Sequence, residues 1–261
     1  MSDYQGRFVW YDLMTTDVPA AQAFYTKVVG WTAAPTAQPG MTYVVLSAGA
    51  AGIGGLMELP KEARDMGAPP SWFGYIAVDD VDALTTKVKK LGGTIHSPPR
   101  DIPDVGRFAV VADPQTAAFM LFKPTMGSAD GQPPEPPPGT PGTIGWRELL
   151  ASDWEKEFAF YSALFGWRKD QAMDMGQMGV YQLFAAMSGP AIGAMYNKPA
   201  TVPANFWLYY FNVEAIDAAA ERVKTGGGKI LNGPMEVPGP SYIVQCMDPQ
   251  GAMFALVAPG R

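Results

Sequence analysis

The chain is poor in the residue types that form crosslinks, hold metals or bind polyanions. Its 261 residues include a single cysteine, Cys246, so no disulfide can form within the chain, and a reducing compartment is expected. It has one histidine, His96. Lys and Arg number 19 against 25 Asp and Glu, a formal net charge of −6. This balance gives no basic footprint for nucleic acid or for an anionic membrane.

Long apolar runs are also absent. No run approaches the roughly 20 residues that a membrane helix needs. The opening MSDYQGRFVW has neither a basic region nor an apolar core, so we expect no secretory signal. What the chain does have is 48% hydrophobic residues, 29 glycines and 25 prolines, which indicates a buried core and many turns. We expect a soluble, cytoplasmic protein.

Two stretches of the chain carry the same landmarks in the same order. The stretch GRFVWYDLMTTDVPAAQAFYTKVVGW begins at Gly6, and GTIGWRELLASDWEKEFAFYSALFGW begins 136 positions later at Gly142. Later landmarks repeat 135 positions apart: Trp72 with Trp207, and the Asp-Pro-Gln of Asp113 with that of Asp248. The repeat predicts two duplicated domains, residues 1–124 and 142–261, joined by a proline-rich, semi-rigid linker at 125–141.

Each half contains two smaller units of strand, helix and three strands. In the first unit a strand at 10–14 leads to Asp17, a suitable helix cap, and to an apolar stripe that ends at Gly30. The strands predicted to follow are 42–48 and 52–59. The second unit has a strand at 73–78, a helix at 81–91, and strands at 94–97, 107–112 and 119–122. The prediction is an α+β fold of four βαβββ modules.

This pattern resembles the vicinal oxygen chelate superfamily of glyoxalases, bleomycin-resistance proteins and extradiol dioxygenases. The resemblance lies in the capping Asp, the amphipathic helix ending in Phe-Tyr and Gly-Trp, and the closing Asp-Pro-Gln before an apolar strand. It covers nearly all of residues 6–124 and 142–259 and is closest to tandem, two-domain glyoxalase-like proteins. It implies two curved sheets, each wrapping one cavity, with the helices outside.

The resemblance also implies where metal ligands would stand. They lie seven residues before the acid that caps the helix, and seven residues after the Asp of Asp-Pro. Here these positions hold Trp10, Phe73, Trp146, Leu208, Met120 and Ala255. None of these side chains can coordinate a hard or borderline divalent ion, and one histidine cannot supply a two-histidine iron site. We therefore expect no metal and no other cofactor. Five of these residues become candidate ligand-binding residues instead: Trp10, Phe73, Met120, Trp146 and Leu208.

Residues two apart on a strand share a face, which predicts the remaining cavity residues. Each half would then hold one carboxylate and one tyrosine, Asp12 with Tyr75 and Glu148 with Tyr210. A carboxylate in an apolar cavity suits general acid–base catalysis, and a nearby tyrosine can donate to an oxyanion. The alternative is that both acids make structural salt bridges or hydrogen bonds, with the tyrosines packed in the core.

The leading hypothesis is a glyoxalase, bleomycin-resistance or dioxygenase-like protein that binds a small molecule without the usual metal. A lyase or isomerase step would use Asp12 or Glu148. Two alternatives stay open: a metal-dependent lyase or dioxygenase whose ligands lie elsewhere or are shared across a dimer, and a drug-sequestering protein without turnover. The expected partner is a small-molecule ligand, with no nucleic acid and no membrane, and a homodimer is left open.

Overall fold

The computed structural model describes residues 4–36, 42–125, 136–187 and 189–261. The first half of the chain forms β1 (Phe8–Thr15), α1 (Val18–Val29), β2 (Thr32–Pro35), β3 (Tyr43–Ala48), β4 (Ala51–Glu58), α2 (Lys61–Asp65), β5 (Ser71–Ala77), α3 (Val81–Lys90), β6 (Thr94–Ile102), β7 (Gly106–Ala112) and β8 (Ala118–Pro124). The second half forms β9 (Ile144–Ala151), α4 (Trp154–Phe165), β10 (Arg168–Asp174), η1 (Gly176–Met178), β11 (Val180–Ala185), β12 (Ala191–Asn197), β13 (Phe206–Asn212), α5 (Ile216–Thr225), β14 (Lys229–Val237), β15 (Ser241–Met247) and β16 (Met253–Ala258).

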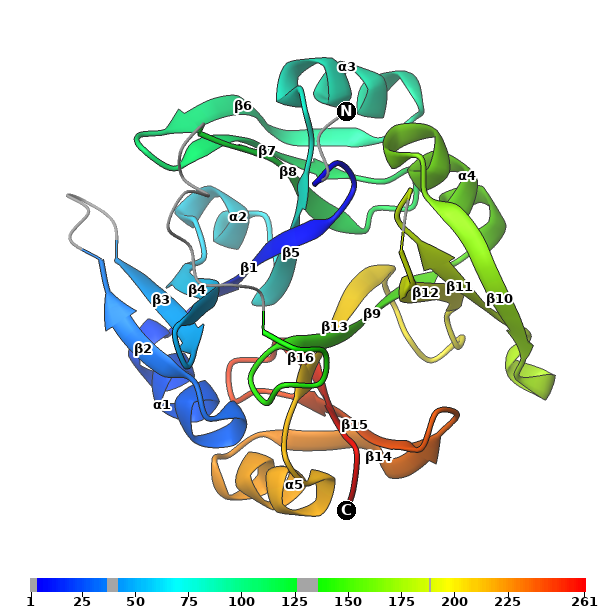
Figure 1. Cartoon of the computed structure of the whole chain (residues 1–261). Helices are drawn as coiled ribbons and strands as arrows, with labels where there is room; N and C mark the ends of the chain where they lie inside the picture. Colours follow the sequence, from blue (N-terminus) through cyan, green and yellow to red (C-terminus); the bar gives the residue numbers. More distant parts are fainter. Residues whose placement is uncertain (1–3, 37–41, 126–135, 188) are drawn as a thin grey trace. The chain divides into compact units, whose positions relative to one another are not determined.

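The strands form two eight-stranded sheets with the same order (Figure 1). One runs β2-β3-β4-β1-β5-β8-β7-β6, and the other β10-β11-β12-β9-β13-β16-β15-β14. The first strand of a module pairs parallel with its last strand, as in β1 with β4 and β13 with β16, and the other pairs within modules are antiparallel. This arrangement confirms the predicted α+β fold of four βαβββ modules.

Some elements differ from the sequence prediction. The strand β2 is short and largely exposed, so it lacks the apolar alternation by which a strand is found in sequence. The strand β6 continues to Ile102 rather than ending at Ser97, although Pro98 and Pro99 follow. Its pairing with β7 shifts register between Ser97 and Arg100, and such a bulge accommodates prolines that cannot donate a hydrogen bond.

The predicted linker falls partly outside the described residues, which omit 126–135. Its described remainder up to 141 forms turns, with Thr140 N donating to Pro137 O at 3.1 Å. Among the described residues, no helix has both the length and the apolar character required to cross a membrane.

The predicted helix ends are in place. The carboxylate of Asp17 accepts a hydrogen bond from Ala20 N at 3.0 Å at the start of α1, and Gly30 ends the helix with φ of 88°. In α4, Asp153 accepts from Lys156 N at 3.2 Å, and Gly166 ends the helix with φ of 74°. Glycine suits these ends because it adopts positive φ without a steric penalty from Cβ.

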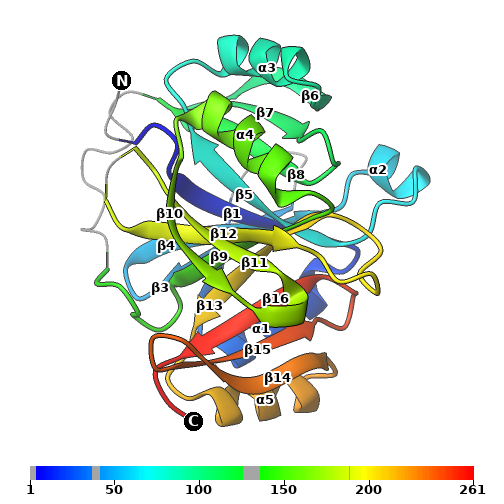
Figure 2. The same ribbon diagram turned by 90° about the vertical axis from the view of Figure 1, so that its right-hand side faces the viewer.

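The chain packs as two compact units, and each unit combines modules from both halves of the sequence. Unit 1 contains β5–β8 and α3 together with most of the module from β9 to β12 and α4. Unit 2 contains most of the module from β1 to β4 and α1 together with β13–β16 and α5. Within unit 1, α3 contacts α4 (Figure 2). Within unit 2, α1 contacts α5. The boundaries of the sequence halves, at 124 and 142, stay a prediction.

Each unit is tied together by a buried chain of Trp, Tyr and Asp side chains. In unit 1, the indole of Trp207 donates to the Tyr161 hydroxyl at 2.9 Å, which donates to Asp113 Oδ2 at 3.0 Å. Burial raises the pKa of Tyr161 well above its usual range, so the phenol keeps its proton and stays a donor. The other oxygen, Asp113 Oδ1, accepts from the backbone N–H groups of Gln115 at 3.0 Å and Ala117 at 2.9 Å.

Unit 2 repeats this chain with the corresponding residues. Trp72 donates to Tyr25 at 2.9 Å, and Tyr25 donates to Asp248 Oδ2 at 3.0 Å. Asp248 Oδ1 accepts from the amides of Gln250 at 3.0 Å and Ala252 at 2.8 Å. In both units the tyrosine and the aspartate come from opposite halves of the sequence, so the hydrogen bond joins the two halves.

A second pair of bonds also joins the halves. The indole of Trp31 donates to Gly142 O at 2.6 Å in unit 2, and that of Trp167 donates to Gly6 O at 2.8 Å in unit 1. Both glycines have positive φ, 76° at Gly6 and 87° at Gly142. A Cβ at Gly142 would come within 2.8 Å of the Ala48 side chain, so the close approach requires glycine.

The buried chains predict the effect of removing one hydroxyl. Tyr161→Phe leaves Trp207 Nε1 and Asp113 Oδ2 each short of a partner, and an unsatisfied buried polar group costs about 1–3 kcal/mol. We expect a lower free energy of unfolding by denaturant, with a similar loss for Tyr25→Phe in unit 2. Tyr4→Phe is the control, since Tyr4 is 53% exposed. Equal stability of Tyr161→Phe and Tyr4→Phe would contradict the structural role of the chain.

Candidate functional site

The two predicted carboxylates are buried and hydrogen-bonded to tyrosines. Asp12 in β1 is 2% exposed and accepts a hydrogen bond from the Tyr43 hydroxyl in β3 at 2.7 Å. Glu148 in β9 is 6% exposed and accepts from the Tyr181 hydroxyl in β11 at 2.6 Å. Both pairs are short and charge-assisted, which makes them strong for hydrogen bonds of this type.

Sequence reasoning missed the two tyrosines of these pairs. Tyr181 lies 138 positions after Tyr43, whereas the landmarks around the first helices repeat at 136. The second half therefore has two more residues between its helix and this strand, and a comparison at one offset does not align the tyrosines. The available signal was a tyrosine at the start of each strand, first in β3 (YVVLSA) and second in β11 (VYQLFA).

The residue opposite each carboxylate is matched to the length of the acid. In the register of β1 with β4, Asp12 lies opposite Gly55. A Cβ on Gly55 would come within 2.2 Å of the Tyr43 hydroxyl and ring, so glycine leaves the space that the tyrosine occupies to reach the short aspartate. In the second half Ala194 lies opposite Glu148, whose extra methylene group carries the carboxylate further from the backbone. Both halves thus keep a carboxylate–tyrosine hydrogen bond, although one uses aspartate and the other the longer glutamate.

The two predicted tyrosines lie in unlike surroundings. Tyr210 in β13 is 1% exposed, lies opposite Ala255 of β16, and accepts a hydrogen bond from Gln245 Nε2 at 2.9 Å. Tyr75 in β5 is 6% exposed, lies opposite Met120 of β8, and meets the Phe122 ring edge-on with centroids 5.8 Å apart. Gln245, which binds the Tyr210 hydroxyl, is another residue that sequence reasoning missed.

The candidate ligand-binding residues fall into two groups by burial. Trp10, Phe73 and Trp146 are half-buried, and each tryptophan is the third residue of its strand. Met120 and Leu208 are fully buried, at 0% and 1% exposure. The half-buried aromatic residues retain accessible surface for a ligand, while Met120 and Leu208 pack in the core in this conformation.

The structure groups these candidates by unit rather than by sequence half. Asp12 with Tyr43, and Tyr210 with Gln245, belong to unit 2. Glu148 with Tyr181, and Tyr75 with Met120, belong to unit 1. Asp12 is hydrogen-bonded to Tyr43, and Glu148 to Tyr181, so each carboxylate has a tyrosine partner that the sequence did not predict. The predicted catalytic pairs, Asp12 with Tyr75 and Glu148 with Tyr210, stay a prediction.

The residues at the expected metal positions do not suit a metal. They are aromatic or aliphatic side chains and one thioether, none of which binds a hard or borderline divalent ion. Across the described part of the chain, no group of three or more His, Cys, Asp or Glu residues is arranged to hold an ion. The donor set therefore does not fit the metal that the resemblance implies.

The thiol of Cys246 does not join the candidate chemistry. It lies in β15 at 0% exposure, and burial raises its pKa to about 12. Because the thiolate is the reactive form, a thiol that stays protonated and enclosed is a poor nucleophile. Cys246 is therefore a core residue.

Comparison with known families matches this geometry. The sequence profile of the Glyoxalase/Bleomycin resistance protein/Dioxygenase superfamily matches residues 7–121 and 143–256. The chain belongs to this superfamily. The match covers one segment in each half, in agreement with the internal repeat, and confirms the resemblance drawn from the sequence.

Relatives at about one-third identity match nearly the whole chain. It is 34% identical over 261 residues to "Putative glyoxylase CFP32" of Mycobacterium tuberculosis, covering 99% of this chain and 97% of the relative. It is 31% identical over 264 residues to the anthracycline biosynthesis protein DauV of Streptomyces sp. (strain C5), covering 97% and 93%.

Solved structures share the superfamily fold at low identity. The Mn(II)-bound glyoxalase from Novosphingobium aromaticivorans is 19% identical with a TM-score of 0.65, covering 98% of this chain and 82% of that one. The 2,3-dioxygenase LapB from Pseudomonas sp. KL28 is 12% identical with a TM-score of 0.65, covering 99% and 94%. These similarities establish the fold.

The fit between Gly55 and Tyr43 gives a prediction for this superfamily member. In Gly55→Ala the new methyl group displaces the Tyr43 ring and breaks its bond to Asp12, a loss of about 1.5–3 kcal/mol for a charge-assisted hydrogen bond. Tyr43→Phe removes the same bond. The free energies of unfolding should therefore be non-additive, and the double variant should cost little more than the larger single change. Fully additive costs would show that Gly55 does not act through Tyr43.

Proposed function

We propose that the chain binds a small organic molecule through its carboxylate–tyrosine pairs, without the usual metal, and that the carboxylates carry a lyase or isomerase step. One observation supports this most directly. Asp12 and Glu148, at corresponding strand positions, are both buried carboxylates that accept short hydrogen bonds from tyrosines. They lie two residues along the strand from Trp10 and Trp146, which stand at the positions where the superfamily resemblance implies metal ligands.

The chemistry of such a pair is that of a prepared proton acceptor. The tyrosine hydroxyl donates to the carboxylate and so favours its ionised form, even though the site is buried. An ionised carboxylate accepts a hydrogen bond from a ligand hydroxyl or amine, or removes a proton from it as a general base. If the same carboxyl group returns that proton to another atom of the ligand, the net reaction is an isomerisation and needs no further proton carrier.

The surrounding side chains and the relatives support an aromatic ligand. Trp10, Phe73 and Trp146 are half-buried aromatic residues close in sequence to the carboxylates or the candidate tyrosines. One relative is named for anthracycline biosynthesis and another as a glyoxylase. We propose a planar aromatic ketone or quinone with a hydroxyl group, which stacks on aromatic walls and offers a proton to the carboxylate.

Ligand binding in carboxamide variants tests this proposal. Asp12→Asn and Glu148→Gln keep the side-chain shape but cannot accept a proton, so we expect any turnover to be lost. For binding of a hydroxyanthraquinone, followed by tryptophan fluorescence, losing a charge-assisted bond of about 1.5–3 kcal/mol weakens affinity about 10- to 150-fold. Tyr43→Phe and Tyr181→Phe, which keep the carboxylates, are the matched variants.

The same variants distinguish the structural interpretation. If the acids only stabilise the fold, the carboxamide variants should melt at lower temperature while the affinity for the hydroxyanthraquinone stays unchanged. Binding by the native chain without any product would instead favour ligand sequestration, since acidic and aromatic sites suit cationic planar molecules. No saturable binding of any hydroxylated aromatic ketone by the native chain would rule out the proposed ligand class.

The absence of metal-binding side chains from the expected positions gives a separate prediction. After incubation with Mn(II), Fe(II), Ni(II) or Zn(II) and desalting, the purified chain should retain much less than one ion per molecule by elemental analysis. The reason is that tryptophan, phenylalanine and aliphatic side chains offer no lone pair to such ions. Retention of one tightly bound ion per chain would overturn the metal-independent proposal.

A further inference from the structure

Unit 1 contains a buried acid pair away from the carboxylate–tyrosine pairs. Glu157 lies in the first turn of α4 and is 1% exposed, and Asp113 lies at the end of β7 and is also 1% exposed. Their carboxyl groups are close enough for a hydrogen bond between them. Among the described residues, neither carboxyl oxygen of Glu157 makes a hydrogen bond of good geometry. The Gln115 side-chain amide is close enough to favour the ionised form of Glu157 weakly, but it donates to Asp153 O at 2.9 Å.

Two buried carboxyl groups that face each other with no donor between them cannot both be ionised at low cost. A proton placed between them turns the repulsion into a hydrogen bond and supplies the missing donor. The bonding of Asp113 decides where the proton resides. Asp113 already accepts from Tyr161, Gln115 and Ala117, and these bonds favour its ionised form. Glu157 is therefore the group that holds the proton.

Unit 2 lacks this acid pair although it repeats the rest of the cluster. Asp248, Tyr25 and Trp72 take the places of Asp113, Tyr161 and Trp207. The residue that corresponds to Glu157 is Ala21, 136 positions earlier, and it is fully buried. The molecule thus contains its own comparison: two matching Trp–Tyr–Asp clusters, of which only the one in unit 1 has a second acid.

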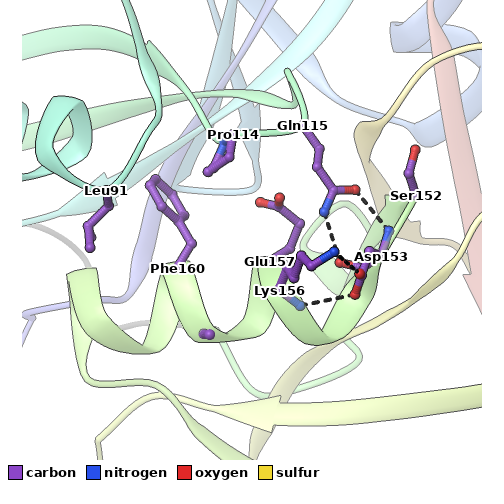
Figure 3. A pocket seen from close by; sticks show the side chains of 9 residues that line it. Leu91, Pro114, Gln115, Ser152, Asp153, Lys156, Glu157 and Phe160 are labelled. Carbon is purple, nitrogen blue, oxygen red and sulfur yellow. Dashed lines mark hydrogen bonds and ion pairs between the residues drawn. The ribbon is translucent and has the colours of Figure 1, made fainter.

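The surroundings of Glu157 leave a way for its proton to reach solvent. A pocket of about 680 Å³ is lined by Glu157, Gln115, Lys156 and Phe160 among others (Figure 3). The Glu157 side chain rises from α4 toward the segment that carries Pro114 and Gln115. The negative charges of Asp113 and Asp153 act on Glu157, and Lys156, which lines the same pocket, pairs with Asp153 at 2.8 Å.

We propose that Glu157 and Asp113 share one proton at neutral pH, and that loss of this proton in alkaline solution loosens the turn between β7 and β8 in unit 1 alone. Two adjacent buried negative charges repel each other, and opening the turn relieves this repulsion by separating them. The turn leads directly into β8, which carries Met120 opposite Tyr75, so the loosening reaches candidate ligand-binding residues. The device is independent of the proposed function, since neither carboxyl group belongs to it.

The direction of the pH dependence follows from linkage. Burial, followed by the negative charge of Asp113, raises the pKa of Glu157 to about 9. In an opened turn the side chain regains an ordinary carboxyl pKa of about 4.3. The closed turn therefore binds one proton more than the opened turn between these values. The stabilisation of the closed turn by this proton is therefore fully present below the opened-turn pKa. It is lost as the pH rises through the closed-turn pKa of Glu157.

Hydrogen exchange of matched amides tests the proposal in the full-length chain. The Ala117 amide donates to Asp113 in unit 1, and the Ala252 amide donates to Asp248 in unit 2. Their exchange-rate ratio cancels the intrinsic pH dependence of exchange. We expect the ratio of Ala117 to Ala252 to rise about tenfold per pH unit from about pH 6 to pH 8 and to level off above about pH 9. A ratio that does not change with pH would overturn the proposal.

Two variants assign the effect to Glu157. Glu157→Gln keeps the shape and donates a permanent hydrogen to Asp113, and Glu157→Ala reproduces the residue of unit 2. In both, the amide ratio should become independent of pH. The indole N–H signal of Trp207 should titrate with a midpoint near pH 9 in the native chain, while that of Trp72 should not. Persistence of the Trp207 titration in either variant, or an equal response of both indoles, would refute the assignment.

Discussion

The hydrogen-bonded chain of tryptophan, tyrosine and aspartate is the constraint on which the two units depend. Its indole, phenol and carboxylate groups are all buried, so each must find a partner within the protein. Tyr161 of α4 satisfies Asp113, and Tyr25 of α1 satisfies Asp248. Because each bond joins residues from opposite halves of the sequence, satisfying both requires that modules from the two halves pack together within each unit.

Duplication preserved this skeleton while side chains around it diverged. Gly55 lies opposite Asp12 where Ala194 lies opposite Glu148, and Met120 pairs with Tyr75 where Ala255 pairs with Tyr210. Each of these changes alters the volume of a side chain, while the strands keep the same pairing. The two halves are therefore one architecture with two sets of side chains, and any ligands they take need not be the same.

Membership of the glyoxalase superfamily establishes the fold, but the residues decide the chemistry. The solved glyoxalase from Novosphingobium aromaticivorans binds Mn(II). In this chain, the positions at which the superfamily resemblance implies metal ligands carry aromatic and aliphatic side chains and one thioether. A metal ion can activate a ligand by stabilising the negative charge that develops on it. A buried carboxylate held by a tyrosine can activate a ligand by removing a proton as a general base. The proposed function relies on the second, with Asp12 and Glu148 in the leading roles.

The amino-acid sequence by itself determined the number, order and type of the modules, because apolar periodicity, helix caps and repeated landmarks are local signals. It also predicted Asp12 and Glu148 as candidate carboxylates, because the alternation of side chains along a strand is a local signal. It did not find Tyr43 and Tyr181, which a two-residue difference in length moved off the common offset, nor the Asp113–Glu157 pair, whose members are 44 positions apart. It also gave no sign that Trp31 would bind Gly142, or Trp167 Gly6. Only the tertiary structure decided these contacts, because a buried polar group takes its partner from whatever the fold places beside it, regardless of distance along the chain.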